Sequence, residues 1–228
     1  MAALVGKLLH APDAHFRLAW RAPALTINGR LLTAGVVGAM CWGAAMGSHV
    51  GRDHLWITTL KMPLFFLFTL ALCFPLMHIT LLVSGVRART SQTLTVALSG
   101  ISTLAICLGA CAPVVGLFCA SAPIPSMASY LNLYVLCLAC GVVAGVAGLR
   151  VLARGMRSLT TSGIKAPLIV WALVYQFVGA QVAWLLRPWI GSSYGVDGYS
   201  LSHGLSGNFY MGVWAVLTRW VTELGAMS

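Results

Sequence analysis

Polar side chains interrupt the apolar run between Trp171 and Gly191, deep inside it. An amide or a phenol in hydrocarbon needs a hydrogen-bond partner, because no water is there to supply one. Such groups can line a narrow polar pore, or they can bond neighbouring helices at about 0.6 kcal/mol each. The sequence leaves both interpretations open. The intramembrane polar residues that we consider are Tyr175, Gln176 and Gln181 in this run, with Ser102 and Asn132 in two other apolar runs.

A single histidine, His78, lies inside an apolar run. Its imidazole could ligate a haem or a chlorophyll, gate a proton, or hydrogen-bond a neighbouring helix. A b-type haem held by two histidines needs a second intramembrane histidine, and the apolar runs contain none. We therefore expect no cofactor, and we keep haem or chlorophyll at His78 as the alternative.

Catalytic groups are missing from the apolar runs. An enzyme needs a nucleophile, an acid–base pair or a metal cluster near its substrate, and no acidic residue lies inside any run. Cys107 and Cys111 are four residues apart, and Cys137 and Cys140 lie on the next run, so four thiols could bind a soft metal. No charge compensates buried thiolates there. We expect neither a metal site nor catalysis.

The composition indicates the environment of these groups. Of the 228 residues, 59% are hydrophobic and 8% are charged, whereas a soluble domain carries about 25% charged residues. The length accommodates five or six spans of about 20 residues, with no room for a separate soluble domain. The net charge of +10 is spread between apolar runs rather than gathered in a groove-reading motif. Nucleic acid is therefore not an expected partner, and the lipid bilayer is.

The apolar runs predict an all-α polytopic bundle of five transmembrane helices. We assign this domain to residues 31–191, after a basic amphipathic segment over residues 1–30 and before an outer loop and interfacial helix over residues 192–228. The expected spans cover residues 31–47, 61–84, 93–119, 130–149 and 171–191. Residues 48–60 and 150–165 are expected to form loops between spans.

Amphipathic segments flank the spans at both ends. Residues 1–30 combine basic side chains with apolar ones at helical spacing, and Phe209–Leu224 places its large apolar side chains opposite Arg219 and Glu223. Both patterns are typical of helices that lie in the membrane interface. Aromatic and basic residues near the span ends are expected to anchor the chain at that depth. The predicted anchors are Trp184, Arg187, Trp189, Trp214 and Trp220.

Small residues recur at every fourth position in two of the spans. Such a stripe lets a second helix approach closely, and dispersion contacts then hold the two together. For the first span we expect the second helix to come from this chain. The predicted packing positions are Gly35, Gly43 and Gly47 in the first span, and Gly141 and Gly145 in the fourth.

Basic residues are distributed unequally between the two membrane faces. Ten of the fourteen lysines and arginines, with Asp13, fall on the amino-terminal face and give it +9. The other four, with three acidic residues, give the opposite face +1. The positive-inside rule then predicts an odd number of spans and a cytoplasmic amino terminus. We expect a bacterial inner membrane as the location.

Four segments, together with the basic amphipathic start, carry a family resemblance. They are Lys61–Leu64 (KMPL), Tyr175–Gln181 (YQFVGAQ), Trp184–Gly191 (WLLRPWIG) and Gly207–Tyr210 (GNFY). The chain resembles the Yip-domain family of Rab-interacting membrane proteins and, more closely, uncharacterised bacterial membrane proteins of similar length. Yip-domain proteins are five-span, non-enzymatic membrane organisers, so the resemblance implies that fold and that kind of role. It assigns no ligand or GTPase contact to any residue.

Three functions follow, in order of preference. We expect a non-enzymatic integral membrane scaffold or accessory subunit, which docks onto a membrane-protein partner or onto further copies of itself. The second is a small oligomeric channel for ions or small solutes. The third is a pigment- or haem-binding subunit that uses His78.

Overall fold

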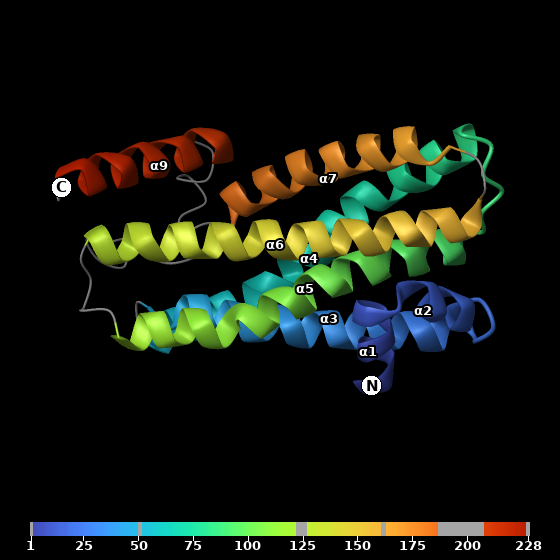
Figure 1. Ribbon diagram of the computed structural model, residues 1–228, viewed down its shortest axis with the longest axis horizontal. Helices are drawn as coiled ribbons and strands as arrows, with labels where there is room; N and C mark the ends of the chain where they lie inside the picture. The colour runs from blue at the N-terminus through green and yellow to red at the C-terminus, as the bar shows by residue number, and fades with distance from the viewer. Residues whose placement is uncertain (1, 50–51, 122–126, 161–162, 187–207, 227–228) are drawn as a thin grey trace.

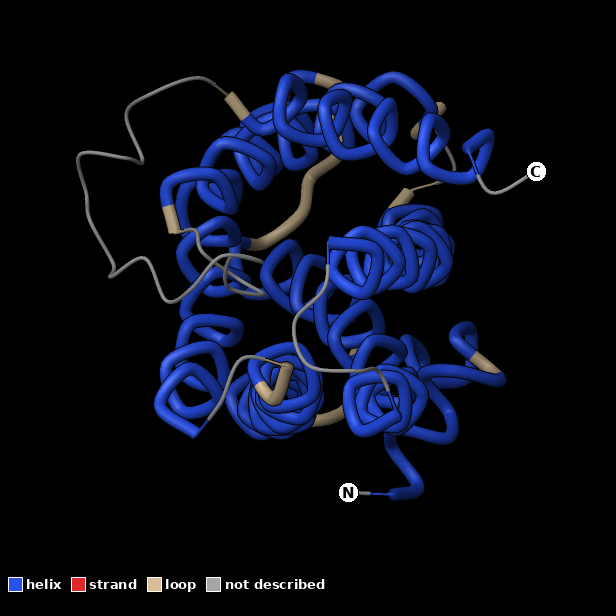
Figure 2. The backbone as a smooth tube through the Cα atoms, turned by 90° about the vertical axis from the view of Figure 1, so that its left-hand side faces the viewer, coloured by secondary structure: helices blue, strands red, loops and turns tan. Residues whose placement is uncertain are grey.

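The chain folds into a bundle of helices (Figure 1). The computed structural model describes residues 2–49, 52–121, 127–160, 163–186 and 208–226, and within these ranges it contains helices and no strands (Figure 2). The predicted carboxyl-terminal end of the fifth span, with the anchors Arg187 and Trp189, lies outside the described residues. The helices are α1 (Ala2–His10), α2 (Pro12–Ala19), α3 (Ala24–Gly47), α4 (Arg52–Val83), α5 (Thr90–Ser121), α6 (Met127–Leu159), α7 (Lys165–Leu185) and α9 (Phe209–Ala226).

Five of the described helices, α3 to α7, are long and apolar enough to cross a membrane. Their number and order confirm the predicted all-α, multi-pass bundle. Helix α9 is not among these five. A spanning helix needs about 20 mostly apolar residues. Helix α9 is amphipathic and has one charged face, so its apolar residues are too few for a span.

The helix ends correct the loop assignments made from the sequence. Residues 52–60, expected in a loop, form the first turns of α4, and residues 150–159 form the last turns of α6. Helix α3 likewise begins at Ala24 rather than at residue 31. At 33 residues α6 is roughly 50 Å long, against about 30 Å of hydrocarbon. A polar helix end can therefore continue into the interface, and the Arg157 side chain suits a helix carboxyl terminus.

Helix α3 lies against both α4 and α5, and glycines set how close it comes to each. A Cβ atom added at Gly35 would lie 2.9 Å from the Ser102 hydroxyl oxygen of α5. Added at Gly43 or Gly47, it would lie within 2.7 Å of α4 backbone atoms. The small-residue stripe of the first span is therefore used inside the chain, as expected. Hydrogen bonds cross the same contacts, because the Ser102 hydroxyl donates to the Leu31 carbonyl at 2.8 Å.

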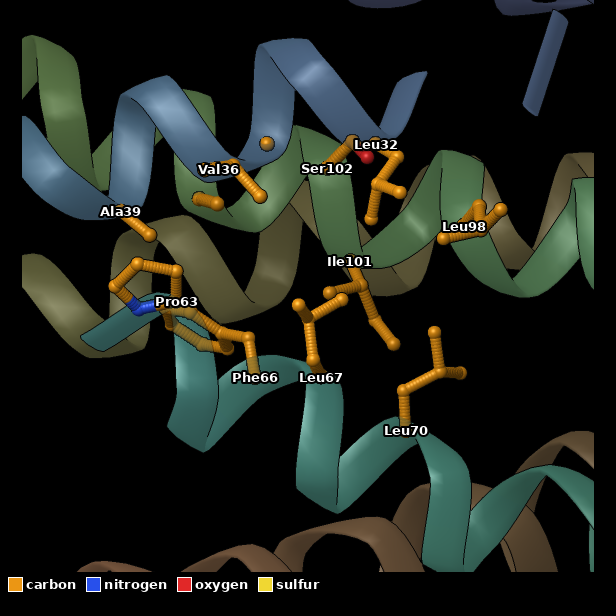
Figure 3. A pocket seen from close by; sticks show the side chains of 12 residues that line it. Leu32, Val36, Ala39, Pro63, Phe66, Leu67, Leu70, Leu98, Ile101 and Ser102 are labelled. Atoms are coloured by element: carbon orange, nitrogen blue, oxygen red, sulfur yellow. The ribbon is translucent and has the colours of Figure 1, made fainter. Parts of the chain in front are cut away.

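The junction of α3, α4 and α5 is tightly filled. A space of about 20 Å³ there is bordered by apolar side chains such as Val36, Phe66 and Ile101, with the Ser102 oxygen at one edge (Figure 3). One water molecule needs about 10–15 Å³ and several polar partners. This space is a packing defect of about water size and not a ligand site.

Helices α1 and α2 pack against the bundle at the end where α3 begins and α6 ends (Figure 1). The Phe16 side chain is 1% exposed, and a Cβ at Gly155 of α6 would collide with its ring. The Asp13 carboxylate accepts a 2.8 Å hydrogen bond from the Arg154 guanidinium. Much of the apolar face of this segment is thus covered by α5 and α6 rather than by lipid.

Candidate binding cleft between α6 and α7

Helices α6 and α7 stand apart, although both belong to the bundle. Helix α6 packs on α5, where a Cβ at Gly148 would lie 2.7 Å from the Gly100 carbonyl oxygen. Helix α7 packs on α4, where a Cβ added at Gly179 would lie 3.5 Å from the Thr69 side chain. Because α5 and α4 flank α3, their outer partners are held apart and make few direct contacts. A space of about 640 Å³ lies between them.

We call this space the α6–α7 cleft. Its wall is formed by all five span-length helices and by the first residue of α9. The described wall residues include no aspartate, glutamate, lysine, arginine or histidine. The principal ones are Trp42, Met46, Met62, Phe65, Phe66, Ile101, Leu104, Leu108, Tyr134, Cys137, Leu138, Gly141, Gly145, Val146, Leu149, Leu152, Trp171, Tyr175, Gln176, Ala180, Ala183 and Phe209.

Glycines on α6 create much of the room. A Cβ atom added at Gly141 or Gly145 would meet nothing within 4 Å, whereas one at Gly148, a turn further on, would press on α5. The packing contact expected at Gly141 and Gly145 is therefore not made within the described chain. Both residues border the cleft instead. The helix is turned so that one edge of its glycine face packs and the other stays open.

Polar groups of α7 lie on the opposite wall. The rings of Trp171 and Tyr175 stack at 4.8 Å, and the indole Nε1 and the phenol Oη are both buried without a hydrogen-bond partner. The neighbouring Gln176 is exposed, and its amide makes no hydrogen bond with any described residue. Three groups with unused hydrogen-bonding capacity thus lie within six consecutive residues midway along α7. Among the described residues of α7 that border the cleft, the others are alanine and glycine.

The other predicted pore residues lie elsewhere. Ser102 bonds α3, and the Asn132 side-chain oxygen accepts a 2.8 Å hydrogen bond from the Trp220 indole of α9. Gln181 is half-buried on α7 and does not border the cleft. The structure therefore brings Tyr175 and Gln176 to one space and separates them from the other three. The five predicted pore residues do not line one common space among the described residues, and the channel stays a prediction.

His78 lies near the end of α4 and faces the start of α5. Its Nδ1 is 3.0 Å from the Thr93 hydroxyl, and its Nε2 is 3.4 Å from the Thr90 hydroxyl. The Phe74 ring stacks on the imidazole at 6.3 Å. A haem iron or a chlorophyll magnesium needs one ring nitrogen as its ligand, and both nitrogens here are engaged by α5. This geometry favours the interhelical hydrogen-bond role. Among the described residues, no three His, Cys, Asp or Glu side chains gather in a way that could hold a metal ion.

The described aromatic anchors divide into two kinds. Trp214 is 71% exposed, as an anchor facing lipid or the interface must be. Trp184 instead covers Gly212 of α9, where an added Cβ would collide with its ring. Trp220 bonds Asn132 of α6. Two of the predicted anchors thus hold α9 against α7 and α6, beside the cleft.

Two features of α4 that bear on the cleft were missed by sequence reasoning. Lys61 donates to the Leu186 carbonyl at 3.3 Å and ties the end of α7 to α4. The sequence could have indicated this contact, because a lysine next to an apolar run must find a hydrogen-bond acceptor. Phe65 and Phe66 line the cleft from α4 with no such signal, because apolar residues that face lipid look the same in the sequence.

The comparisons with known proteins add no assignment. No protein-family model, no curated protein and no solved structure matches this chain. The resemblance to Yip-domain proteins therefore depends only on the segments quoted from the sequence, and stays a prediction.

Proposed function

We propose that this protein is a non-enzymatic integral membrane subunit that holds a membrane-embedded molecule in the α6–α7 cleft. The observation that carries the proposal is the open glycine face of α6. Gly141 and Gly145 have no neighbour for an added Cβ, while Gly35, Gly43, Gly47 and Gly148 are all in close contact with another helix. We therefore take the open glycine face of α6 as the binding surface of the proposed accessory subunit.

An empty cleft is physically unfavourable. Protein interiors are close-packed, and side chains that border a void lose dispersion contacts on that side. A space of about 640 Å³ lies within the range of about 300–1,000 Å³ that is usual for ligand sites. The wall offers apolar contact and no acidic, basic or imidazole group among its described residues, which supports binding rather than acid–base chemistry.

A second candidate is docking of another helix on the same face. Val142, Val143 and Val146 flank the glycines and are 60%, 67% and 45% exposed. Together with Gly141 and Gly145 they form a surface of the small-xxx-small type, which associates with helices in membranes. This candidate corresponds to a membrane-protein partner or a homo-oligomer.

The proposal also states in which membrane the protein lies and which of its faces is cytoplasmic. The resemblance to bacterial membrane proteins supports a bacterial inner membrane. The excess of basic residues on the face with α1, α2 and the end of α6 supports a cytoplasmic location for that face.

Filling the cleft tests the proposal. Gly145→Leu places a side chain in the open space, and native mass spectrometry of the protein extracted in a mild detergent measures what remains bound. The matched control is Gly116→Leu on α5, where an added Cβ also meets nothing within 4 Å but which does not border the cleft. We expect a bound mass in the wild type and the control that is lost from Gly145→Leu.

The mass identifies the occupant. A bound small molecule supports the first candidate, and a second protein chain lost in Gly145→Leu supports the second. Equal occupancy in all three proteins, or none in any of them, contradicts both.

A further inference from the structure

We propose that the occupant of the α6–α7 cleft is an uncharged, lipid-soluble ring compound bearing carbonyl groups, of the isoprenoid-quinone type, bound through the amide of Gln176. This inference rests on the proposed function and adds the chemical class of the ligand. It concerns binding alone and involves no electron transfer.

The absence of charged side chains from the described wall argues against charged ligands. The described wall of the cleft has no cationic side chain to pair with a phosphate and no anionic one to pair with an amine. Ionised groups in a low-dielectric site need such partners. Phospholipid headgroups and charged metabolites therefore have no recognition element here.

The depth of Gln176 in the membrane argues against ligands whose polar groups lie at the edge of the hydrocarbon. Gln176 is eleven residues from Lys165, where α7 begins, and nine from Leu185, where α7 ends. At 1.5 Å per residue these separations are roughly 16 Å and 14 Å, so the amide lies near the middle of the span. The ester groups of a phospholipid lie at the edge of the hydrocarbon, about 15 Å from its centre. A molecule that meets Gln176 must carry its polar group in its lipid-soluble body.

Hydrogen-bond complementarity points to carbonyls. A glutamine amide offers two N–H donors and one acceptor oxygen, and Gln176 uses none of them with a described residue. The Trp171 indole, which is 5% exposed, and the Tyr175 hydroxyl add two donors without partners within the same six residues. Both of these atoms are buried, so the exposed Gln176 amide is the group that an occupant meets first. The two N–H donors of Gln176, beside an indole that can only donate, favour a ligand that carries acceptors.

The shape of the wall favours a flat ring with an apolar extension. The stacked rings of Trp171 and Tyr175 lie on the α7 side and the Phe65 ring on the α4 side. Aromatic walls accommodate planar rings by offset or edge-to-face contact. The α6 wall from Tyr134 to Leu152 spans eighteen residues, roughly 27 Å, which gives room for a long hydrocarbon tail.

A pair of ligands that differ only in the carbonyls provides the test. One probe is a benzoquinone with a ten-carbon alkyl tail, and the other is a plain benzene ring with the same tail. Binding to the full-length protein in lipid nanodiscs is measured by equilibrium partition, with Gln176→Leu as the variant. Gln181→Leu is the control, because Gln181 lies on the same helix away from the cleft.

We expect the wild type and Gln181→Leu to prefer the quinone by roughly fivefold, the effect of one net hydrogen bond. Gln176→Leu should bind both probes equally and should retain its thermal unfolding midpoint. Gly145→Leu should weaken both probes. Equal binding of the two probes by the wild type, or a preference that survives in Gln176→Leu, overturns the carbonyl assignment while binding in the cleft stands. If Gly145→Leu changes the binding of neither probe, the proposed function fails as well.

Discussion

The imidazole Nε2 of His15 lies 3.1 Å from the Ser99 hydroxyl oxygen, and the two residues are 84 positions apart in the chain. The contact joins α2, which lies before the first span, to the buried side of α5. His15 is 1% exposed, and its ring meets that of Phe16 edge to face at 5.1 Å. The amino-terminal helices are therefore fixed to the bundle by specific contacts as well as by amphipathicity.

Acidification is expected to release α1 and α2. Burial disfavours the imidazolium and lowers the pKa of His15 from its ordinary value of 6.5. Its contribution to docking is therefore complete above about pH 6.5 and is lost as the pH falls through the lowered pKa. Amide hydrogen exchange of residues 2–19 should be faster at pH 5 than at pH 7.5, after correction for the intrinsic effect of pH on exchange.

Two variants define the origin of this effect. His15→Gln should remove the acid-dependent increase, because its amide does not titrate. His10→Gln should keep it, since His10 is exposed on the same segment. An increase of equal size in His15→Gln would assign the pH dependence to another group.

The crossing of α3 and α5 at Gly38 is expected to be intolerant of a methyl group. A Cβ at Gly38 of α3 would lie 2.5 Å from the Ala105 carbonyl oxygen of α5, so Gly38→Ala must push the two helices apart. Overpacking of this kind costs about 1–3 kcal/mol. A lower midpoint of thermal unfolding in detergent, followed by circular dichroism, should show it. Gly116→Ala, with open space around its Cβ, should be neutral or more stable, because alanine is favoured over glycine in helices by about 0.5–1 kcal/mol.

The attachment of α9 is expected to depend on one indole N–H. Trp220→Phe keeps an aromatic ring and removes the donor to Asn132, at a cost of about 0.5–1.5 kcal/mol. Amides of α9 should then exchange faster. Trp214→Phe, at a position that is 71% exposed, should leave exchange unchanged. Equal exchange rates in the wild type and Trp220→Phe would show that this hydrogen bond does not hold α9.

The two ends of the chain are expected on opposite sides of the membrane. Single cysteines can be introduced as Lys7→Cys in α1 and Met211→Cys in α9, both exposed positions, after the seven native cysteines are replaced by alanine. In spheroplasts a membrane-impermeant maleimide should label Met211→Cys, and Lys7→Cys only after lysis. Labelling of both without lysis, or of neither, would require an even number of crossings.

The properties that depend on composition and local spacing were predictable from the sequence. Five spans and an all-α bundle follow from runs of apolar residues long enough for a bilayer. The stripe at Gly35, Gly43 and Gly47 follows from a four-residue period, and a Cβ added at any of the three would press on α4 or α5. The close approach to α5 at Gly38, which lies off that stripe, was missed. The span ends were predicted less well, because a helix continues into the interface after its apolar run has ended.

Only the tertiary structure decided which glycines pack and which stay open. Gly141 and Gly148 lie on the same helix and look alike in the sequence, yet a Cβ added at Gly141 would meet nothing within 4 Å and one at Gly148 would press on Gly100. In water, a polar face shows which side of a helix is outside. In a bilayer, both the lipid and the neighbouring helix are apolar, so the pattern does not fix the rotation of α6 or α7. The cleft and the place of Gln176 on its wall arise from that rotation, which packing alone determines.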